Sequence, residues 1–329
     1  MAEKEKILEV KDLRKYYPIR KGLLQKVVGQ VKAVDGVSFD IHRGETFGLV
    51  GESGCGKSTI GRTIIRLTPP TGGEALYKGT DVFSLKKKQL RSLRPHLQMI
   101  FQDPYSSLDP KMPVGEIIGE AVREHGIVSK DEYRSYILSI MKICGLRPYH
   151  IDRYPHEFSG GQRQRICIAR SLALNPDLII ADEPVSALDV SIQAQIINLM
   201  KDLQEKKDIS YLFISHDLSV VEYISDIVGV MYLGTLVELA PKSEIFKHPA
   251  HPYTQALLSA VPVPDPEVKM HRVLLQGDLP SPANPPKGCK FHTRCPYAKD
   301  ICKEVTPEFK DHGNRHLCAC HLYDDGTWV

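Results

Sequence analysis

A glycine-rich stretch from Gly51 to Ser58 carries the clearest chemistry in the sequence and fits the spacing G-x-x-x-x-G-K-[ST]. Glycines let successive backbone N–H groups curl around phosphate oxygens, and a helix that follows adds the positive end of its dipole. Lys57 can then reach the β- and γ-phosphates of a nucleotide, Ser58 can offer a hydroxyl to Mg²⁺, and Thr59 can add a phosphate contact. The stretch predicts a nucleoside triphosphate site formed by Ser53, Gly54, Cys55, Gly56, Lys57, Ser58 and Thr59.

Two neighbouring carboxylates follow a second apolar run, Leu178 to Ala181. In α/β proteins the carboxyl ends of the strands are where ligands bind. Asp182 is suited to hold Mg²⁺, directly or through water, and Glu183 to polarise an attacking water. A solvated acidic strand end is the alternative, but the phosphate loop upstream favours a hydrolytic pair.

The elements around these residues follow a strand–loop–helix order. Residues 46–50 form an apolar run that enters the glycine loop, and residues 58–67 carry apolar residues at helical spacing. Buried parallel strands are predicted at 178–181 and 211–214, with a crossover helix at 192–203. The main body is therefore expected to be α/β.

Further elements are predicted on either side of this core. Alternation of apolar and polar residues predicts strands at 7–13 and 37–41, separated by a basic, flexible insertion around 20–29. Helical spacing at 116–144 and 162–174 predicts a largely helical insertion, which stops at Asn175-Pro176. Twelve of the 23 prolines lie in residues 241–307, which predicts irregular chain from about Leu239 to Pro286.

Composition limits the possible partners. The formal charge of +3 is close to neutral and gives no reason to expect nucleic acid or an anionic membrane surface. No export signal is recognised at the N-terminus, and the apolar runs are far too short to cross a bilayer, so any membrane role is expected to be peripheral.

The cysteines are unevenly distributed along the chain. Cys55, Cys144 and Cys167 are expected to be small buried residues. Five others crowd into the C-terminal part, where a metal or redox site is favoured over disulfides: Cys289, Cys295, Cys302, Cys318 and Cys320. Their spacing alone leaves zinc, an iron–sulfur cluster and free thiols open.

Ser159-Gly160-Gly161-Gln162, preceded by Phe158 and followed by Arg163, resembles the signature motif of ATP-binding-cassette (ABC) proteins. The usual first residue is Leu, and Phe158 keeps its bulk and apolar character. The resemblance implies an α/β P-loop NTPase core in residues 1–240, with an antiparallel β subdomain and a helical subdomain at about 105–172. A small cysteine-rich extension would occupy residues 241–329.

The resemblance also assigns roles to single residues. Tyr17 matches the aromatic residue that stacks on adenine, and Gln102 matches the glutamine that contacts Mg²⁺ and water and couples to a membrane subunit. His216 matches the switch histidine at the γ-phosphate, and Ser186 to Asp189 resembles a loop at the dimer interface. In this family each ATP lies between the phosphate loop of one subunit and the signature of the other, which here comprises Ser159, Gly160, Gly161 and Gln162.

The C-terminal part resembles one subfamily more closely. His251 to Leu258 is similar to a hallmark of the oligopeptide/dipeptide importer ATPases, and the basic insertion near Lys21 resembles the second, F-type, of their two paired subunits. The resemblance implies a [4Fe-4S] cluster held by Cys289, Cys295, Cys302 and a fourth cysteine. Counting four residues from His316 selects Cys320, with Cys318 as the alternative ligand and zinc as the alternative metal.

The sequence therefore predicts an ATP-hydrolysing subunit, peripheral at the cytoplasmic face of the cell membrane. Its expected partners are a second ABC ATPase (a heterodimer, or a homodimer in isolation), two permease subunits and, indirectly, an external peptide-binding protein. The same machinery importing nickel or another small solute is one alternative. A soluble ABC ATPase acting on nucleic acid is another, although the chain contains a single cassette and has near-neutral charge.

Overall fold

The computed structural model describes residues 4–261, 275, 277–324 and 326. The chain divides into two compact units. Unit 1 contains Ile41–Glu45 and Ser84–Ile214, together with N-terminal residues up to Ile7. Unit 2 contains Leu8–Asp40, Thr46–Phe83 and the chain from Ser215 onwards.

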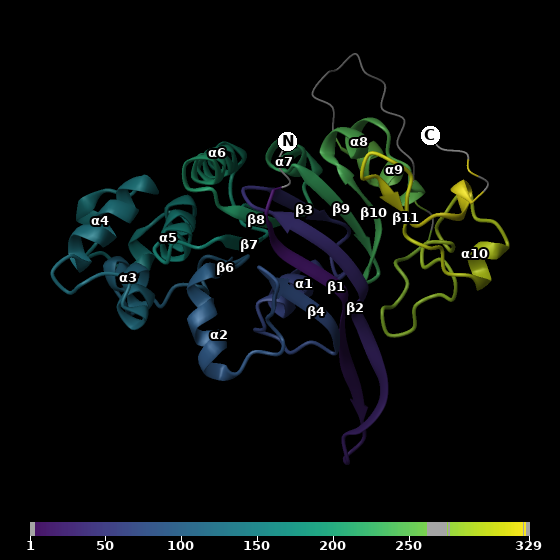
Figure 1. Cartoon of the computed structure of the whole chain (residues 1–329), viewed down its shortest axis with the longest axis horizontal. Coiled ribbons are helices and arrows are strands. Elements are labelled where there is room, and N and C mark those ends of the chain that lie inside the picture. Colours follow the sequence, from purple (N-terminus) through teal and green to yellow (C-terminus); the bar gives the residue numbers. More distant parts are fainter. Residues whose placement is uncertain (1–3, 262–274, 276, 325, 327–329) are drawn as a thin grey trace. The chain divides into compact units, whose positions relative to one another are not determined.

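Unit 1 contains three parallel strands and a group of helices (Figure 1). The strands lie in the order β8–β7–β6, and Ile100 pairs with Ala181 and Asp182 with Ile214. Their bounds are β6 Leu97–Ile100, β7 Leu178–Asp182 and β8 Ser210–Ile214. The helices are α2 Lys87–Leu93, α3 Val114–His125, α4 Tyr133–Ile143, α5 Gly160–Leu172 and α6 Val190–Lys207.

These elements follow from the local sequence. Every residue of β7 and β8 is buried, as expected of parallel strands covered on both faces. The predicted crossover is confirmed as α6, and the predicted helical insertion contains α3, α4 and α5. Helix α5 ends before Asn175, which adopts a left-handed φ of 50° ahead of Pro176.

Unit 2 contains an antiparallel sheet in the order β2–β1–β4–β5, and Figure 1 shows β1 and β2 as one long hairpin. The bounds of these strands are β1 Lys6–Lys21, β2 Lys26–His42, β4 Gly72–Tyr77 and β5 Thr80–Asp81. A second group runs β3–β9–β10–β12–β11, in which only the β3–β9 pair is parallel. Its bounds are β3 Thr46–Val50, β9 Ile227–Tyr232, β10 Thr235–Pro241, β11 Lys310–Asp311 and β12 Leu317–Cys318.

The helices of unit 2 are short: α1 Lys57–Ile64, α7 Leu218–Ile224, α8 Lys242–Lys247, α9 Pro252–Ser259 and α10 Ile301–Glu304. The predicted order of strand, glycine loop and helix is confirmed by β3 and α1. Within the described part of the chain, no helix has both the length and the apolar character that a membrane span requires.

Two local predictions were wrong. The insertion around residues 20–29 is not a separate flexible element, because β1 and β2 continue through it and leave only a turn at 22–25. The chain after Leu239 is not irregular at first, because α8 and α9 occupy most of residues 242–259. Pro252 stands in the first turn of α9, where its missing N–H costs nothing.

Candidate active site

The phosphate loop joins β3 to α1, and its glycines are required by close backbone approaches. A Cβ added to Gly51 would lie 2.2 Å from the carbonyl oxygen of Met231, and one on Gly56 would lie 2.0 Å from that of Ala33. Both have positive φ, 149° and 107°, as does Gly54 at 79°. Larger side chains would both clash and strain the backbone. The loop therefore has the curled backbone that an anion-binding nest needs.

Lys57 points its ammonium group into this loop. Its Nζ donates to the carbonyl oxygens of Gly51 (2.7 Å) and Glu52 (3.0 Å) and lies 3.8 Å from the Cys55 sulfur. Helix α1 begins at Lys57, and no side chain caps its N-terminus. Ser58 and Thr59 occupy its first turn and are partly exposed. A positive ammonium beside an uncapped helix end is suited to receive phosphate oxygens.

The other predicted loop residues divide between surface and core. Ser53 and Gly54 are exposed at the tip of the loop, whereas Cys55 is buried. Burial raises the pKa of the Cys55 thiol, so it packs as a small apolar residue rather than reacting. Cys144 and Cys167 are buried as well, which confirms the prediction for all three.

In unit 1, Gln102 and Glu183 come together as the strand register requires. Since Ile100 pairs with Ala181, the residues that follow these two strands lie side by side. The Gln102 Nε2 donates to Glu183 Oε2 at 2.9 Å. Asp182 at the end of β7 is fully buried. A buried carboxylate beside an amide-held one suits a Mg²⁺ ligand and a general base.

Glu183 also has an unusual backbone. Its φ is 47°, a left-handed value that side-chain-bearing residues rarely adopt. The Glu183 N–H donates to the Ile214 carbonyl at 2.9 Å, and its own carbonyl accepts from the Ser186 hydroxyl at 3.1 Å. Such strain concentrates at functional sites, and the sequence pattern contained no signal for it.

His216 lies in unit 2, at the same strand ends as the phosphate loop. The preceding residue, Ser215, donates its N–H to the carbonyl of Leu49 in β3 at 3.2 Å. The Ser215 hydroxyl in turn accepts the Asp217 N–H at 3.0 Å, which fixes the turn around the histidine. His216 is exposed.

The two tyrosines of β1 differ in their surroundings. The Tyr17 ring is 39% exposed, and the Lys15 ammonium lies 4.8 Å from its centroid. The Tyr16 hydroxyl instead donates to Asp35 Oδ1 at 2.5 Å. Tyr17 is therefore the more exposed of the two rings, and its stacking on a base stays a prediction.

The signature residues form the N-terminus of α5. The Ser159 hydroxyl accepts the Gln162 N–H at 3.4 Å, and the Gln162 side chain accepts the Ser159 N–H at 3.1 Å. This is a capping box, so the motif also has a structural role. A Cβ on Gly161 would lie 2.4 Å from the Ile192 side chain, so this glycine permits α5 and α6 to pack closely, whereas Gly160 has ordinary space.

One residue of the loop has a partner that the sequence did not predict. The Glu52 carboxylate makes two bonds with the guanidinium of Arg294, at 2.9 and 3.1 Å, and the Glu52 N–H donates to the Tyr253 hydroxyl at 2.8 Å. Glu52 occupies a position of the loop motif that accepts any residue. Its partners are 242 and 201 residues away, so no local signal could have found them.

The C-terminal cysteines fall in unit 2 and influence one another. Burial, with contributions from the nearby thiols of Cys289, Cys295 and Cys302, raises the pKa of Cys320 to about 12. Burial also raises the pKa of Cys289 to about 11, with Cys302 and Cys295 contributing. Among the described residues, no group of three or more His, Cys, Asp or Glu is arranged to hold a metal ion.

Comparison with known proteins identifies the family to which the chain belongs. Residues 34–186 match the ABC transporter family, and residues 237–302 match the oligopeptide/dipeptide transporter C-terminal region. Over 325 residues the chain is 60% identical to the oligopeptide transport ATP-binding protein AppF of Bacillus subtilis, covering 98% of this chain and 99% of AppF. The chain belongs to the ATP-binding proteins of ABC transporters, in the oligopeptide/dipeptide branch. It is an ATPase.

Other similarities agree with this family. The dipeptide transport ATP-binding protein DppF of Escherichia coli is 52% identical over 318 residues, covering 97% of this ATPase and 95% of DppF. The solved dimeric cassette MJ0796, bound to ADP and Pi after hydrolysis, gives a TM-score of 0.64 at 28% identity over 71% of this chain and 98% of that one. The cbiO1 structure from Clostridium perfringens gives 0.63 at 26% identity, over 74% and 92%. The predicted fold class is confirmed for the ATPase core.

Proposed function

We propose that this ATPase powers the import of oligopeptides or dipeptides through a membrane transporter. The observation that carries the proposal is the match of residues 237–302 to the oligopeptide/dipeptide transporter C-terminal region. This segment includes α9, whose Tyr253 accepts a hydrogen bond from the phosphate loop. The names of AppF and DppF, which state oligopeptide and dipeptide transport, support the same cargo class.

The residue roles proposed for hydrolysis rest on the geometry of each unit. Lys57 exchanges its loop carbonyls for phosphate oxygens, and the first turn of α1 receives the same phosphates. Ser58, Gln102 and Asp182 are the proposed Mg²⁺ ligands, and the ion would neutralise developing charge on the phosphates. Glu183 takes the proton of the attacking water, His216 contacts the γ-phosphate, and Tyr17 stacks on adenine.

A second ATPase subunit completes each site in this proposal. The solved MJ0796 cassette is dimeric with ADP and Pi bound, which supports pairing for a chain of the same fold. The signature from Ser159 to Gln162 would then face the nucleotide of the partner subunit. We infer a heterodimer with a related ATPase, and a homodimer is the alternative.

Membrane partners follow from the proposed transport role. We propose two permease subunits, fed by an external peptide-binding protein, with this ATPase peripheral at the cytoplasmic face of the membrane. ATP binding joins the paired ATPases and hydrolysis releases them, which biases the permeases between two states. The proposed division of the chain is an ATPase domain at 1–240 and an extension at 241–329.

Reconstitution tests the cargo. This chain, its paired ATPase and the two permeases would be placed in proteoliposomes. The peptide-binding protein would be added on the side of the membrane opposite the two ATPases. We expect ATP-dependent uptake of a labelled di- or oligopeptide, and no uptake of ⁶³Ni²⁺. Uptake of nickel but not of peptide would establish the small-solute alternative instead.

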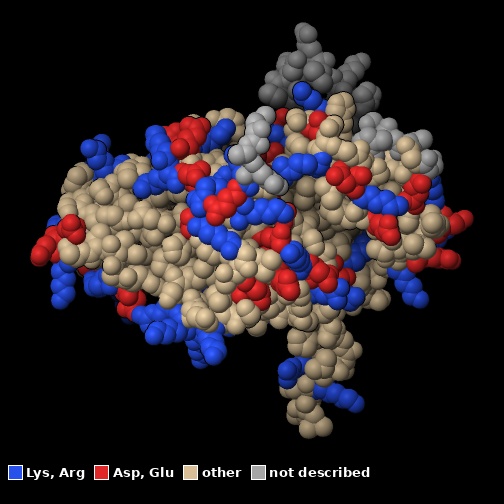
Figure 2. Space-filling view, viewed as in Figure 1, with Lys and Arg blue, Asp and Glu red and all other residues tan. Residues whose placement is uncertain are grey.

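A nucleic-acid role has less support. On the face shown in Figure 2, Lys and Arg side chains lie among Asp and Glu side chains. The formal charge of the chain is +3. Binding to a phosphate backbone generally uses a continuous basic surface.

We also propose that Cys289, Cys295, Cys302 and Cys320 hold a [4Fe-4S] cluster with a structural role. The effect of the other three thiols on the pKa of Cys320, added to that of burial, supports the set. Cys318 is less suited, because it is 1% exposed and its raised pKa comes from burial with contributions from Glu238, Cys320 and Cys289, whereas Cys295 and Cys302 do not contribute. Four thiolates are ligands that suit both an iron–sulfur cluster and zinc, so zinc is the alternative metal.

Anaerobic purification distinguishes the metals. We expect a brown protein with iron–sulfur absorption and about four irons per chain. Cys320→Ser should lose the cluster, whereas Cys318→Ser should keep it. A colourless protein with stoichiometric zinc would overturn the cluster.

A further inference from the structure

The segment from Cys289 to Cys295 contacts the nucleotide-binding part of unit 2 through two cations. Lys290 follows the first cysteine and Arg294 precedes the second. Their charged groups bind two different acidic residues, Asp35 and Glu52. Both side chains are largely buried, at 14% and 9% exposure, so these are built contacts rather than surface ion pairs.

Arg294 acts on the phosphate loop itself. Its guanidinium makes the two parallel bonds to the Glu52 carboxylate that give such pairs a fixed geometry. The bond with Glu52 also raises the pKa of Arg294, so its charge is permanent. The Glu52 backbone is held from a second side by Tyr253.

Glu52 also contacts Lys57, the lysine proposed to bind the phosphates. Its carbonyl oxygen accepts from Lys57 Nζ at 3.0 Å, and it accepts from the Cys55 N–H at 3.3 Å. The position of the Glu52 peptide therefore sets where the Lys57 ammonium rests and how tightly the loop curls. Glu52 thus contacts both Arg294 and Lys57 and links the two side chains.

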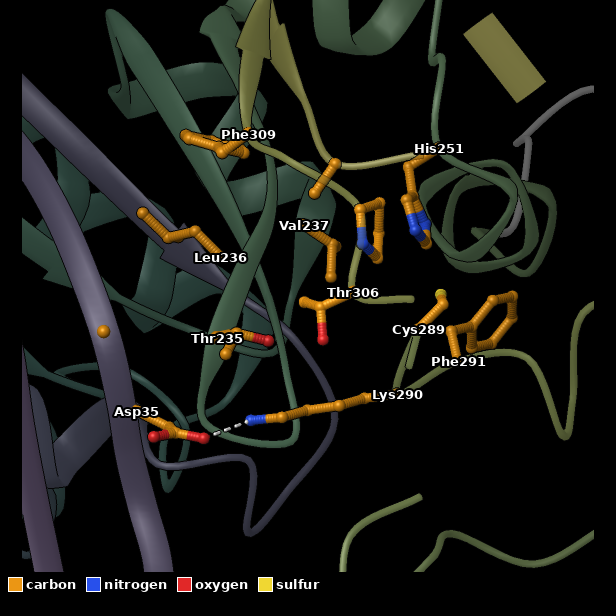
Figure 3. Close-up of a pocket in the computed structure, with 13 residues that line it drawn as sticks. Asp35, Thr235, Leu236, Val237, His251, Cys289, Lys290, Phe291, Thr306 and Phe309 are labelled. Atoms are coloured by element: carbon orange, nitrogen blue, oxygen red, sulfur yellow. Dashed lines mark hydrogen bonds and ion pairs between the residues drawn. The ribbon is translucent and has the colours of Figure 1, made fainter. Parts of the chain in front are cut away.

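Lys290 supports the loop from its other side. Its Nζ donates to Asp35 Oδ2 at 2.9 Å, as Figure 3 shows, and to the carbonyl of Leu233 at 3.0 Å. The next residue, Gly234, donates its N–H to the Cys55 carbonyl at 3.0 Å and accepts the Asp35 N–H at 2.8 Å. Lys290 thus ties together the two backbone segments that pack against the loop.

Asp35 extends this contact toward the adenine end of the site. It accepts from the Tyr16 hydroxyl at 2.5 Å, and Tyr16 is the neighbour of Tyr17 in β1. The two cations of one short segment therefore reach both the phosphate loop and the strand that carries the exposed tyrosine.

We propose that Arg294 and Lys290 are positioning residues for ATP binding, through which the cysteine-flanked segment holds the phosphate loop in its binding conformation. Neither side chain needs to touch the nucleotide. Because coupling between sites is reciprocal, a change in this segment alters nucleotide affinity, and bound nucleotide stabilises the segment. The proposal rests on ATP binding, and holds for any transported cargo.

The test measures the dissociation constant of Mg·ADP, which binds without turnover, on the full-length protein. Arg294→Gln and Glu52→Gln should each weaken binding about fivefold or more, the lower end of typical coupling between sites. The double variant should be no weaker than either single variant, because both remove the same contact. Arg294→Lys should recover part of the affinity.

A matched control separates positioning from general damage to the extension. Lys303→Gln removes a cation of the same region that pairs only with the exposed Asp300 in the described contacts, and it should bind Mg·ADP as the parent does. Steady-state assays should show a raised KM for ATP in Arg294→Gln with kcat changed less. Unchanged affinity in both Arg294→Gln and Glu52→Gln, or fully additive effects, would overturn the proposal.

Hydrogen exchange gives a second readout without nucleotide. In Arg294→Gln, amides of the phosphate-loop peptide should exchange faster, while those of β7 in unit 1 should not change. If Arg294→Gln does not fold, Glu52→Gln and Lys290→Gln carry the same test from the other members of the network. Loop exchange equal to that of the parent in both would contradict the positioning role.

Discussion

Two glutamates belong to the proposed ATP-binding and hydrolysis residues of this ATPase, and the structure holds their carboxylates in different ways. Glu52 in unit 2 is bound at both oxygens by the cationic Arg294. Glu183 in unit 1 receives a bond from the neutral amide of Gln102. A guanidinium fixes both the charge and the direction of a carboxylate, whereas an amide orients it and leaves it able to accept a proton.

The backbone shows the same division. Glu183 has a strained left-handed φ of 47°. Glu52 is instead fixed through its N–H and carbonyl, which bind Tyr253 and Lys57. The comparison suggests different roles for two carboxylates of equal chemistry: we propose that Glu52 in unit 2 shapes the loop and that Glu183 in unit 1 takes the proton of the attacking water.

The strongest test of this division is Glu183→Gln. The substitution keeps the size of the side chain and removes its ability to take a proton. We expect kcat to fall by about a thousandfold, within the usual contribution of a general base, while Mg·ADP affinity stays unchanged. Phosphate release and nucleotide titration measure the two quantities.

Glu52→Gln is the matched comparison, since it makes the same chemical change in the other unit. It should raise the dissociation constant of the nucleotide and leave kcat at saturating ATP nearly unchanged. The division between the two glutamates would fail if both variants lowered kcat to the same extent.

A smaller effect is expected for Gln102→Ala. Loss of the amide leaves Glu183 without the bond that orients it toward water, and kcat should fall by about a hundredfold, comparable to removal of a single preorganised donor. Gln98→Ala is the control, because Gln98 lies in β6, the strand that precedes Gln102, but donates to the Arg94 carbonyl instead. If Gln102→Ala hydrolysed ATP with an unchanged kcat, Gln102 would have no role in hydrolysis.

The local part of this site could be predicted from the sequence. The loop residues, the apolar run before Asp182 and the helix after Lys57 are adjacent in the chain, so spacing alone identifies them. Gln102 and His216 were found through resemblance to a family, and the parallel register of β6 and β7 supplies the physical reason for the first.

The long-range part could not be predicted. The contact of Arg294 with Glu52 spans 242 residues, and a charged residue at either position is also typical of a solvated surface. The left-handed backbone of Glu183 has no sequence signal, because it is imposed by the contacts with Ile214 and Ser186.

The helix that supports Glu52 is capped by a buried histidine, which makes the stability of unit 2 sensitive to acid. Tyr253, which supports Glu52, stands at the start of α9, and this helix is capped by the His251 ring, whose Nδ1 accepts the Tyr253 N–H at 3.1 Å. The cap requires an unprotonated nitrogen. His251 is 1% exposed, and burial lowers its pKa to about 4.

An unfolded histidine titrates near 6.5. As the pH falls below about 6.5, His251 therefore becomes protonated in the unfolded chain, whereas in the folded protein it stays neutral until about pH 4. Stability from this group is complete above that range and is lost toward pH 4, with a cost of about 2 kcal/mol at pH 5. His251→Asn keeps a capping oxygen without a titrating ring. Chemical denaturation at pH 7.5 and pH 5 should show that the variant loses about 2 kcal/mol less than the parent. Equal losses in the variant and the parent would mean that His251 does not cause the loss of stability at low pH.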